Sequence, residues 1–247
     1  MDPIAFTIFG ISVRWYGILI SIGMILATIA IMKRARLYHI DPNRAIDFAL
    51  VVIPFGVIGA RLYYVIFNWS YYEGDFLKII NTRTGGLAIH GGLIAGILVA
   101  ILLCKLWNIR VMDLLDLGMP AVALAQAVGR WGNFLNQEAY GTPTDLPWAI
   151  LVDGQRVHPT FLYESVWNLL IFLFLIWYER RRKFKGQIFL LYAMLYSFAR
   201  FFIEEFRTDS LMIGEFRVAQ VLSLIVFIVC LLILRMNTRR KNRRIFR

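Results

Sequence analysis

Long apolar stretches alternate with short polar connections along the whole chain of 247 residues. An α-helix needs roughly 20 consecutive apolar residues to cross a bilayer, and these stretches have about that length. Seven of them are predicted to be membrane-spanning helices, at residues 15–32, 45–67, 88–107, 114–135, 161–178, 187–207 and 216–235. The connections leave no room for a soluble domain, so residues 1–247 are predicted to form a single all-α polytopic membrane domain.

The distribution of basic residues predicts the orientation of these spans. Of the amino acids, 59% are hydrophobic and 17% are charged, yet the formal net charge is +11. Most Lys and Arg residues follow the first, third, fifth and last spans, which is the positive-inside pattern of cytoplasmic loops. The N-terminus is therefore expected outside and the C-terminus in the cytoplasm. The same pattern favours a topology signal near anionic lipid over a nucleic-acid-binding arm.

Three further segments complete this picture. The first ten residues, MDPIAFTIFG, lack a basic region and a cleavage site, so no removable signal peptide is expected. The longer outside connections, near 68–87 and 136–160, are expected to form small structures at the membrane surface. Cys104 and Cys230 fall within spans, where two isolated thiols are expected to serve packing.

The end of the fourth span carries side chains that are costly in lipid. Residues 126–141 read QAVGRWGNFLNQEAYG. Gln126, Arg130, Asn133 and Gln137 recur at helical spacing, which predicts that they share one helix face. Lipid cannot satisfy such a stripe, so it must face protein or water.

The sixth span repeats this arrangement in ARFFIEEFR. Arg200, Glu204 and Arg207 are four and three residues apart, near the outer end of the span. Arg200 and Glu204 either form only an intrahelical ion pair, with Arg207 reaching the headgroups, or they face a shared pocket. A central Arg costs roughly 2.5–3.5 kcal/mol on insertion scales, which favours the pocket for Arg200.

Three other spans place polar side chains at a similar depth. Arg61 lies in the second span, His90 opens the third and Tyr16 opens the first. A Trp–Tyr pair at 15–16 is also typical of an interfacial aromatic belt. The glycines that follow His90 indicate close packing between helices.

The balance of these charges predicts an anionic ligand. Arg61, Arg130 and Arg200 face only Glu204, and no acidic cluster in the outer half balances the two remaining charges. Arginine binds phosphate through two parallel hydrogen bonds, a geometry that lysine lacks. The residues therefore predict a pocket for an anionic phospholipid that opens to the outer leaflet.

A thirteen-residue motif connects this pocket to a known family. The stretch GRWGNFLNQEAYG at 129–141 resembles the signature G-R-x-G-N-F-x-N-x-E-x-x-G of the bacterial prolipoprotein diacylglyceryl transferases, with every fixed position met. The resemblance extends to RWYG at 14–17, HGGL at 90–93, HPTFLYE at 158–164 and RFFIEEFR at 200–207. It implies a multi-pass enzyme of the bacterial cytoplasmic membrane that transfers diacylglyceryl from phosphatidylglycerol to the lipobox cysteine of a prolipoprotein. The product that leaves is glycerol phosphate.

The resemblance and the charge pattern together predict the site. The predicted catalytic residues are His90, Arg130 and Arg200. The predicted substrate-binding residues are Tyr16, Arg61, Asn133, Asn136, Glu138, Gly141, Glu204 and Arg207. A thiolate must attack the glyceryl carbon, and arginines stabilise the charge that develops on the leaving phosphate.

The histidines carry the remaining alternatives. His39, His90 and His158 show no ligand spacing, so neither a metal nor another cofactor is predicted. His90 is the candidate base because imidazole titrates near neutrality; alternatively, it only binds the headgroup or caps its helix. His158 is expected to order Tyr163 and Glu164.

Three other functions would also place charged residues within membrane spans. A transporter is typified by repeats and broken helices at the midplane, whereas these charges gather at one end. A lipid-binding scaffold needs the arginines but not the Asn and Glu positions of the signature. A lipid phosphatase needs a nucleophilic His motif, which the sequence does not contain.

Overall fold

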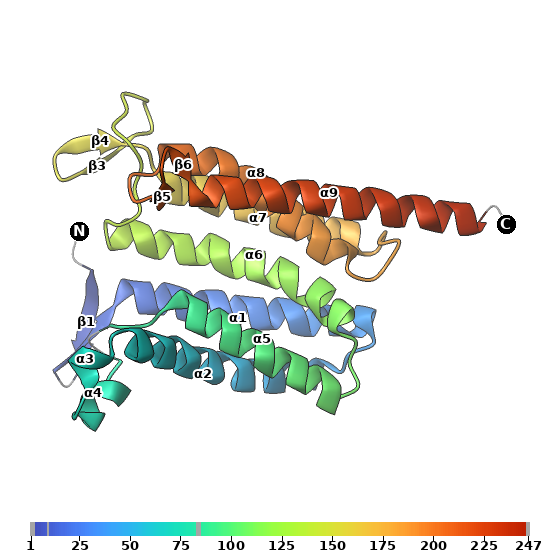
Figure 1. Ribbon diagram of the computed structural model, residues 1–247, viewed down its shortest axis with the longest axis horizontal. Coiled ribbons are helices and arrows are strands. Elements are labelled where there is room, and N and C mark those ends of the chain that lie inside the picture. The colour runs from blue at the N-terminus through green and yellow to red at the C-terminus, as the bar shows by residue number, and fades with distance from the viewer. Residues whose placement is uncertain (1–2, 9, 83–84, 246–247) are drawn as a thin grey trace. The chain divides into compact units, whose positions relative to one another are not determined.

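The computed structural model describes residues 3–8, 10–82 and 85–245, and it confirms the seven predicted spans. Seven helices within this part are long and apolar enough to cross a membrane (Figure 1). They are α1 (Trp15–Ala35), α2 (Pro42–Phe67), α5 (Ile89–Leu106), α6 (Val111–Leu135), α7 (Thr160–Glu179), α8 (Gln187–Phe206) and α9 (Val218–Ile245). A short 3-10 helix, η1 (Arg36–Tyr38), continues α1.

The chain forms two compact units. Unit 1 comprises residues 1–30 and 115–247, and unit 2 comprises residues 31–114. That the whole chain behaves as one polytopic domain stays a prediction.

Unit 2 is built on the close packing of α2 and α5. The side chain of Asp41 caps α2 by accepting a hydrogen bond from the backbone N–H of Asn43 at 2.9 Å. A Cβ atom on Gly91 of α5 would overlap the backbone of Gly59 of α2, so only glycine permits this approach. The glycines after His90 therefore serve helix packing, as predicted.

Two short helices occupy the predicted outside segment 68–87. They are α3 (Trp69–Tyr72) and α4 (Phe76–Ile80). The Asp75 side chain begins α4 by accepting a hydrogen bond from the Lys78 N–H at 3.1 Å. Residues 83–84 of this segment lie outside the described part.

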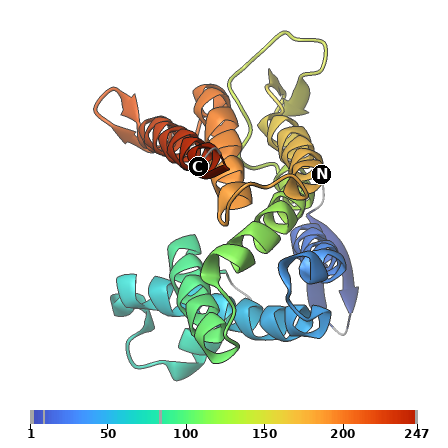
Figure 2. The ribbon, with the colours of Figure 1, turned by 90° about the vertical axis from the view of Figure 1, so that its right-hand side faces the viewer.

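In unit 1, helices α6, α7 and α8 share an apolar core. Its buried members are Ala123, Ile171, Leu175, Ile188 and Tyr192. Helix α9 lies beside α8 (Figure 2), where Leu190, Cys230 and Leu234 pack together. Cys230 is thus a packing residue, as predicted, and Cys104 is likewise buried, within unit 2.

Helix α6 also contacts α1 and the start of α8. Glycine at 23 brings α1 close to α6, because a Cβ there would lie 3.1 Å from the carbonyl oxygen of Ala125. At the start of α6 the fully buried Asp116 carboxylate accepts hydrogen bonds from the N–H groups of Gly186 and Phe189, at 2.8 and 2.9 Å. These bonds satisfy free N–H groups at the start of α8 and hold it against α6.

Three β-hairpins belong to the described residues of unit 1. They pair β1 (Ile4–Ile8) with β2 (Ile11–Arg14), β3 (Ile150–Val152) with β4 (Gln155–Val157), and β5 (Met212–Ile213) with β6 (Phe216–Arg217). The β3–β4 hairpin lies in the predicted outside segment 136–160. In Figure 1 it lies where α6 ends and α7 begins, which is called the hairpin end of unit 1 below.

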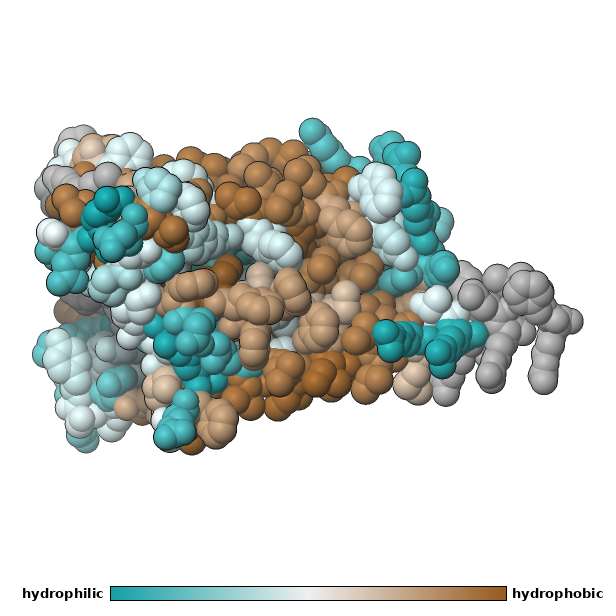
Figure 3. Space-filling view, turned by 90° about the horizontal axis from the view of Figure 1, so that it is seen from above, coloured by the Kyte–Doolittle hydropathy of each residue, from teal (hydrophilic) through white to brown (hydrophobic). Residues whose placement is uncertain are grey.

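The exposed surface of the helices is apolar. Figure 3 shows apolar side chains along the middle of the helices on the face in view, with hydrophilic side chains toward the helix ends. On α9 the exposed residues include Leu222, Ile225, Val229 and Leu232. A water-soluble protein does not expose such a surface, so these positions fit contact with lipid.

Candidate active site

The polar stripe of α6 faces protein at the hairpin end of unit 1. The Tyr192 hydroxyl of α8 donates a hydrogen bond to Gln126 at 2.8 Å. Arg130 lies one turn further, and its Nε forms an ion pair with Glu164 of α7. The predicted stripe ends there with Asn133, because α6 ends at Leu135 and Gln137 has a φ of 53°. The inclusion of Gln137 in the helical stripe was therefore wrong.

Glu164 is the centre of the charged cluster. Its side chain is 5% exposed, and its Oε1 accepts hydrogen bonds from Arg200 at 2.8 Å and Arg207 at 3.4 Å. Its Oε2 forms the ion pair with Arg130. The prediction that no acidic group balances the arginines was wrong, because α7 brings Glu164 between α6 and α8. Sequence reasoning assigned Glu164 to His158 and missed this role.

The charged residues of α8 form the predicted intrahelical ion pair and also face a cluster shared with other helices. Arg200 forms the intrahelical ion pair with Glu204 at 2.5 Å, and its other η nitrogen reaches Glu164. Arg207 is 11% exposed, and its side chain donates to Asp209 at 2.9 and 2.6 Å. The intrahelical pair therefore exists as one part of a three-helix cluster.

Asp209 lies just beyond α8, and Arg207 changes its acidity. Partial burial raises the pKa of Asp209, whereas the hydrogen bonds and charge of Arg207 lower it. The lowering is larger, so the pKa lies below its ordinary value and the carboxylate is charged at neutral pH.

Arg217, on β6, holds the end of α8 in this position. Its Nη1 donates to the carbonyl oxygens of Glu204 and Arg207 at 2.7 and 2.8 Å. These are free carbonyls of a helix C-terminus, which need partners. Sequence reasoning did not single out Arg217, since nothing in the pattern shows that β6 returns to α8.

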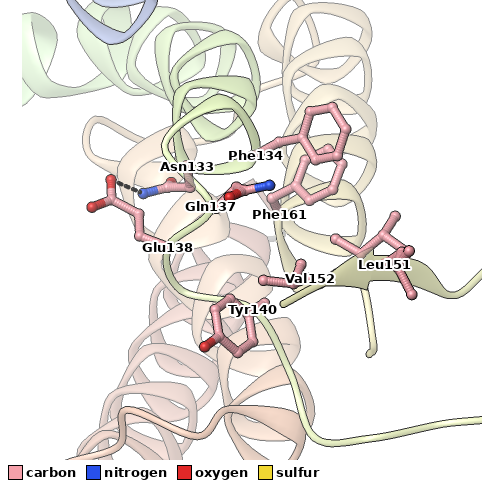
Figure 4. A pocket seen from close by; sticks show the side chains of 9 residues that line it. Asn133, Phe134, Gln137, Glu138, Tyr140, Leu151, Val152 and Phe161 are labelled. Carbon is pink, nitrogen blue, oxygen red and sulfur yellow. Dashed lines mark hydrogen bonds between the residues drawn. The ribbon is translucent and has the colours of Figure 1, made fainter. Parts of the chain in front are cut away.

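The signature continues past α6 as a tight turn. The Glu138 carboxylate accepts a hydrogen bond from the side chain of Asn133 at 3.0 Å (Figure 4). It accepts a second one from the side chain of Asn136 at 3.3 Å. Ala139 has a φ of 54°, and its carbonyl accepts the Thr160 hydroxyl at 2.5 Å. The three predicted polar residues of the signature are thus linked to one another.

Gly141 and Gly132 serve close packing. The Gly141 N–H donates to the His158 carbonyl at 2.9 Å, and Gly141 forms a β-bridge with Arg207. A Cβ on Gly141 would lie 2.6 Å from that of His158. A Cβ on Gly132 would overlap the ring of Tyr16, so Tyr16 lies directly on α6.

His158 orders Tyr163 as predicted. Its Nδ1 lies 3.2 Å from the Tyr163 hydroxyl, which also accepts the Trp148 indole N–H at 2.8 Å. Glu164 turns instead to the arginines.

Arg61 lies in unit 2, in a cage of backbone carbonyls. Its Nε donates to Ile79, and its two η nitrogens donate to Lys78, Asn81, Gly85 and Gly86, at 2.7 to 2.9 Å. Gly85 and Gly86 adopt φ of 89° and 80°, which turns their carbonyls toward the guanidinium. All five N–H groups of Arg61 therefore have protein partners.

His90 also belongs to unit 2. It occupies the first turn of α5, and its ring centroid lies 6.1 Å from that of Tyr63. Its role as base stays a prediction.

Comparisons with known proteins agree with the signature. A family model described as prolipoprotein diacylglyceryl transferase matches residues 3–236. Proteins named phosphatidylglycerol–prolipoprotein diacylglyceryl transferase are similar along their length. The one from Finegoldia magna is 52% identical over 229 residues, 92% of each chain. The one from Clostridioides difficile is 54% identical over 228 residues, 91% of each chain. The one from Clostridium novyi is 47% identical over 257 aligned positions, 100% of each chain. With the signature intact and the match nearly complete, the chain belongs to the prolipoprotein diacylglyceryl transferase family.

Proposed function

We propose that this chain transfers the diacylglyceryl group of phosphatidylglycerol to the lipobox cysteine of prolipoproteins and releases glycerol phosphate. The relatives carry this activity in their names, and the chain covers nearly all of their length. Family membership favours this function over a transporter, a lipid-binding scaffold and a lipid phosphatase.

The free fork of Arg130 is the observation that supports the site. Its Nε is held by Glu164, and its two η nitrogens have no protein partner within the described part of the chain. A guanidinium fixed at one edge presents its other edge for two parallel bonds to phosphate. We assign to Arg130 the phosphate of phosphatidylglycerol.

The reaction exchanges one bond at a glyceryl carbon. The cysteine sulfur forms a thioether bond to this carbon as the bond from carbon to the phosphate oxygen breaks. The electron pair of the broken bond leaves with glycerol phosphate, and the thiol proton passes to a base. Arg130 and Arg200 stabilise the negative charge that grows on the phosphate, an interaction stronger in the transition state than in the ground state.

The other predicted residues hold the substrate or these arginines. Asn133, Asn136 and Glu138 form the polar turn beside Arg130, where they are suited to bind the headgroup hydroxyls. Glu204 holds Arg200, and Arg207 completes the cluster around Glu164.

Four other members of the predicted set act differently. Gly141 and Tyr16 shape the backbone and the packing of α6, and His90 is proposed as the base. For Arg61, predicted to bind substrate, the carbonyl cage favours a role in holding the 78–86 segment.

We place the enzyme in the bacterial cytoplasmic membrane, with the N-terminus and the hairpin end outside. The basic loops support this orientation. Reporter fusions after Arg110 and after the C-terminus should read as cytoplasmic, and a fusion at Gly154 should read as external. An external reading for the C-terminal fusion would overturn the placement of the site.

Substitution of Arg130 tests the function and the mechanism. Arg130→Lys keeps the charge but loses the planar fork, and Arg130→Gln loses both. The loss of one preorganised donor costs roughly 10²–10³ in rate, so the first variant should be severely impaired and the second nearly inactive. Transfer to a lipobox peptide is followed by mass spectrometry on purified protein with phosphatidylglycerol.

A matched control separates catalysis from folding. Arg181 lies two residues beyond the opposite end of α7, with its guanidinium 4.1 Å from the centre of the Trp177 ring. Arg181→Gln should retain activity. Turnover by Arg130→Gln near the wild-type rate, or inactivity explained wholly by misfolding, would refute the assignment.

A further inference from the structure

A pocket lies beside the charged cluster in unit 1. Its walls include Asn133, Gln137 and Glu138 from the signature, Leu151 and Val152 from β3, and Phe161 from α7. Figure 4 shows the polar signature side chains on one side of it and the strand residues on the other. The pocket therefore combines hydrogen-bonding groups with an apolar wall.

The pocket is continuous with the proposed phosphate site. Asn133 follows Arg130 by three residues on α6, and Phe161 precedes Glu164 by three residues on α7. At 1.5 Å per residue, each step is about 4.5 Å along its helix. The pocket thus lies about one helical turn from the Arg130–Glu164 ion pair.

One wall of the pocket is an edge strand. On one side of β4, Thr144 donates to the Arg156 carbonyl at 2.9 Å, and His158 pairs with the 141–142 segment. On the other side β4 pairs only with β3, where Leu151 lies opposite Arg156. Strand β3 is therefore the outer strand of this small sheet.

The register leaves Leu151 open to a partner. In an antiparallel pair of strands, two residues that lie opposite each other either form hydrogen bonds with each other or direct their backbone N–H and C=O groups away from the partner strand. The Arg156 carbonyl points toward Thr144, so the N–H and C=O of Leu151 point away from β4. Within residues 3–8, 10–82 and 85–245 these two groups have no partner, and the side chain is 68% exposed.

We propose that this edge and pocket bind the prolipoprotein segment that flanks the acceptor cysteine, as an added strand on β3. An extended peptide can satisfy both the N–H and the C=O of Leu151, which a lipid acyl chain cannot do. The Glu138 carboxylate in the pocket disfavours a second phosphate. This assignment rests on the proposed function, which requires a peptide thiol at the cluster.

The spacing of an extended chain fits this arrangement. A strand rises about 3.3 Å per residue, so the step of about 4.5 Å from the pocket to Arg130 corresponds to one or two residues. A side chain of the peptide in the pocket, against Phe161, places the cysteine one or two residues away at the level of Arg130. The pocket then selects the residue near the cysteine, and the edge strand fixes the direction of the peptide.

A proline at the edge tests the hydrogen bond. Leu151→Pro removes an N–H that β4 does not use, whereas Leu151→Ala removes only the side chain. The proline variant should raise the KM for the lipobox peptide about three- to tenfold, the effect of one hydrogen bond. Its KM for phosphatidylglycerol should not change, and Leu151→Ala should show the smaller rise. Equal changes in both KM values, or none, would overturn the proposal.

Photocrosslinking provides a test that does not depend on the proline variant. A benzophenone side chain is placed at Leu151 in the full-length protein, and at Ile213 of the β5–β6 hairpin as a control of similar exposure, 69%. Illumination with a labelled lipobox peptide should label the first protein and not the second, and unlabelled peptide should compete. Labelling of phosphatidylglycerol alone at Leu151, or equal peptide labelling at both positions, contradicts the proposal. Transfer measured on the same samples shows separately whether the proposed function holds.

Discussion

Replacement of Glu164 by Gln removes the negative charge around which three arginines gather, with almost no change of shape. The Glu164 carboxylate forms ion pairs with Arg130, Arg200 and Arg207, and its side chain is 5% exposed. Removal of one partner from a buried ion pair costs about 3–5 kcal/mol, because the other charge stays buried. The arginine side chains keep 24, 20 and 11% exposure, so the lower value, about 3 kcal/mol, is expected. This corresponds to a fall in Tm of about 6–12 °C for a chain of this length.

Catalysis should change in a way that stability alone does not predict. The arginines keep their charge in Glu164→Gln, so the KM for phosphatidylglycerol should stay the same or fall. Arg130 loses the group that fixes its Nε, so its fork is no longer preorganised and kcat should fall about 10²-fold. Both constants are measured in the transfer assay below the lower Tm.

Glu205 provides the control for this experiment. It neighbours Glu204 on α8, its side chain is 65% exposed, and its oxygen lies 3.9 Å from Arg217. Glu205→Gln should cost less than about 1 kcal/mol and leave kcat unchanged, as is usual for exposed pairs. A Glu164→Gln enzyme with normal kcat, or with a large rise in KM and no change in kcat, would refute the positioning role.

Three further predictions follow from single contacts. Arg61→Lys offers three donors to five carbonyls, so it should lower the free energy of unfolding by about 2–5 kcal/mol. The folded variant should keep its KM for phosphatidylglycerol. A higher KM would restore the substrate-binding role of Arg61. Gly141→Ala places a Cβ 2.6 Å from that of His158 and should cost about 1–3 kcal/mol, measured by thermal unfolding. The lowered pKa of Asp209 stabilises the fold above its unfolded pKa of about 3.9, and this contribution disappears as pH falls through the lower folded value. Asp209→Asn should therefore flatten thermal stability below about pH 4 by a small amount, since Asp209 is half exposed.

Helical periodicity predicted those parts of the site that lie within one helix. The seven spans depend on the length and hydropathy of apolar stretches. The Gln126–Asn133 stripe and the Arg200–Glu204 pair depend only on spacing along α6 and α8. The same rule failed at Gln137, because the helix had already ended at Leu135. Spacing carries no information beyond the residue where a helix stops.

Contacts between different helices and loops could not be predicted from the sequence, because they depend on how these elements pack. Glu164 stands at the start of α7, and only the packing of three helices brings it to the arginines. The cage of Arg61 depends on backbone carbonyls that any sequence possesses, aimed by the positive φ of Gly85 and Gly86. A surplus of buried arginine is nevertheless a usable signal, since buried positive charge requires an acidic partner from elsewhere in the chain.

The presence of carboxylates in a site for an anion has an electrostatic explanation. The three guanidinium groups of the cluster face three carboxylates, those of Glu164, Glu204 and Asp209, so the cluster as a whole carries no net charge. In the proposed mechanism this neutral cluster holds the phosphodiester of phosphatidylglycerol through the hydrogen bonds of Arg130, so the lipid binds without a large excess of attraction. A phosphomonoester carries about −1.5 to −2, so the leaving group gains charge as the bond breaks. Of these three arginines, only Arg130 has both η nitrogens without a partner among the described residues. In the proposed mechanism the added attraction therefore appears in the transition state, where it accelerates the reaction. Three arginines without these carboxylates would bind the ground state more tightly and gain less in rate.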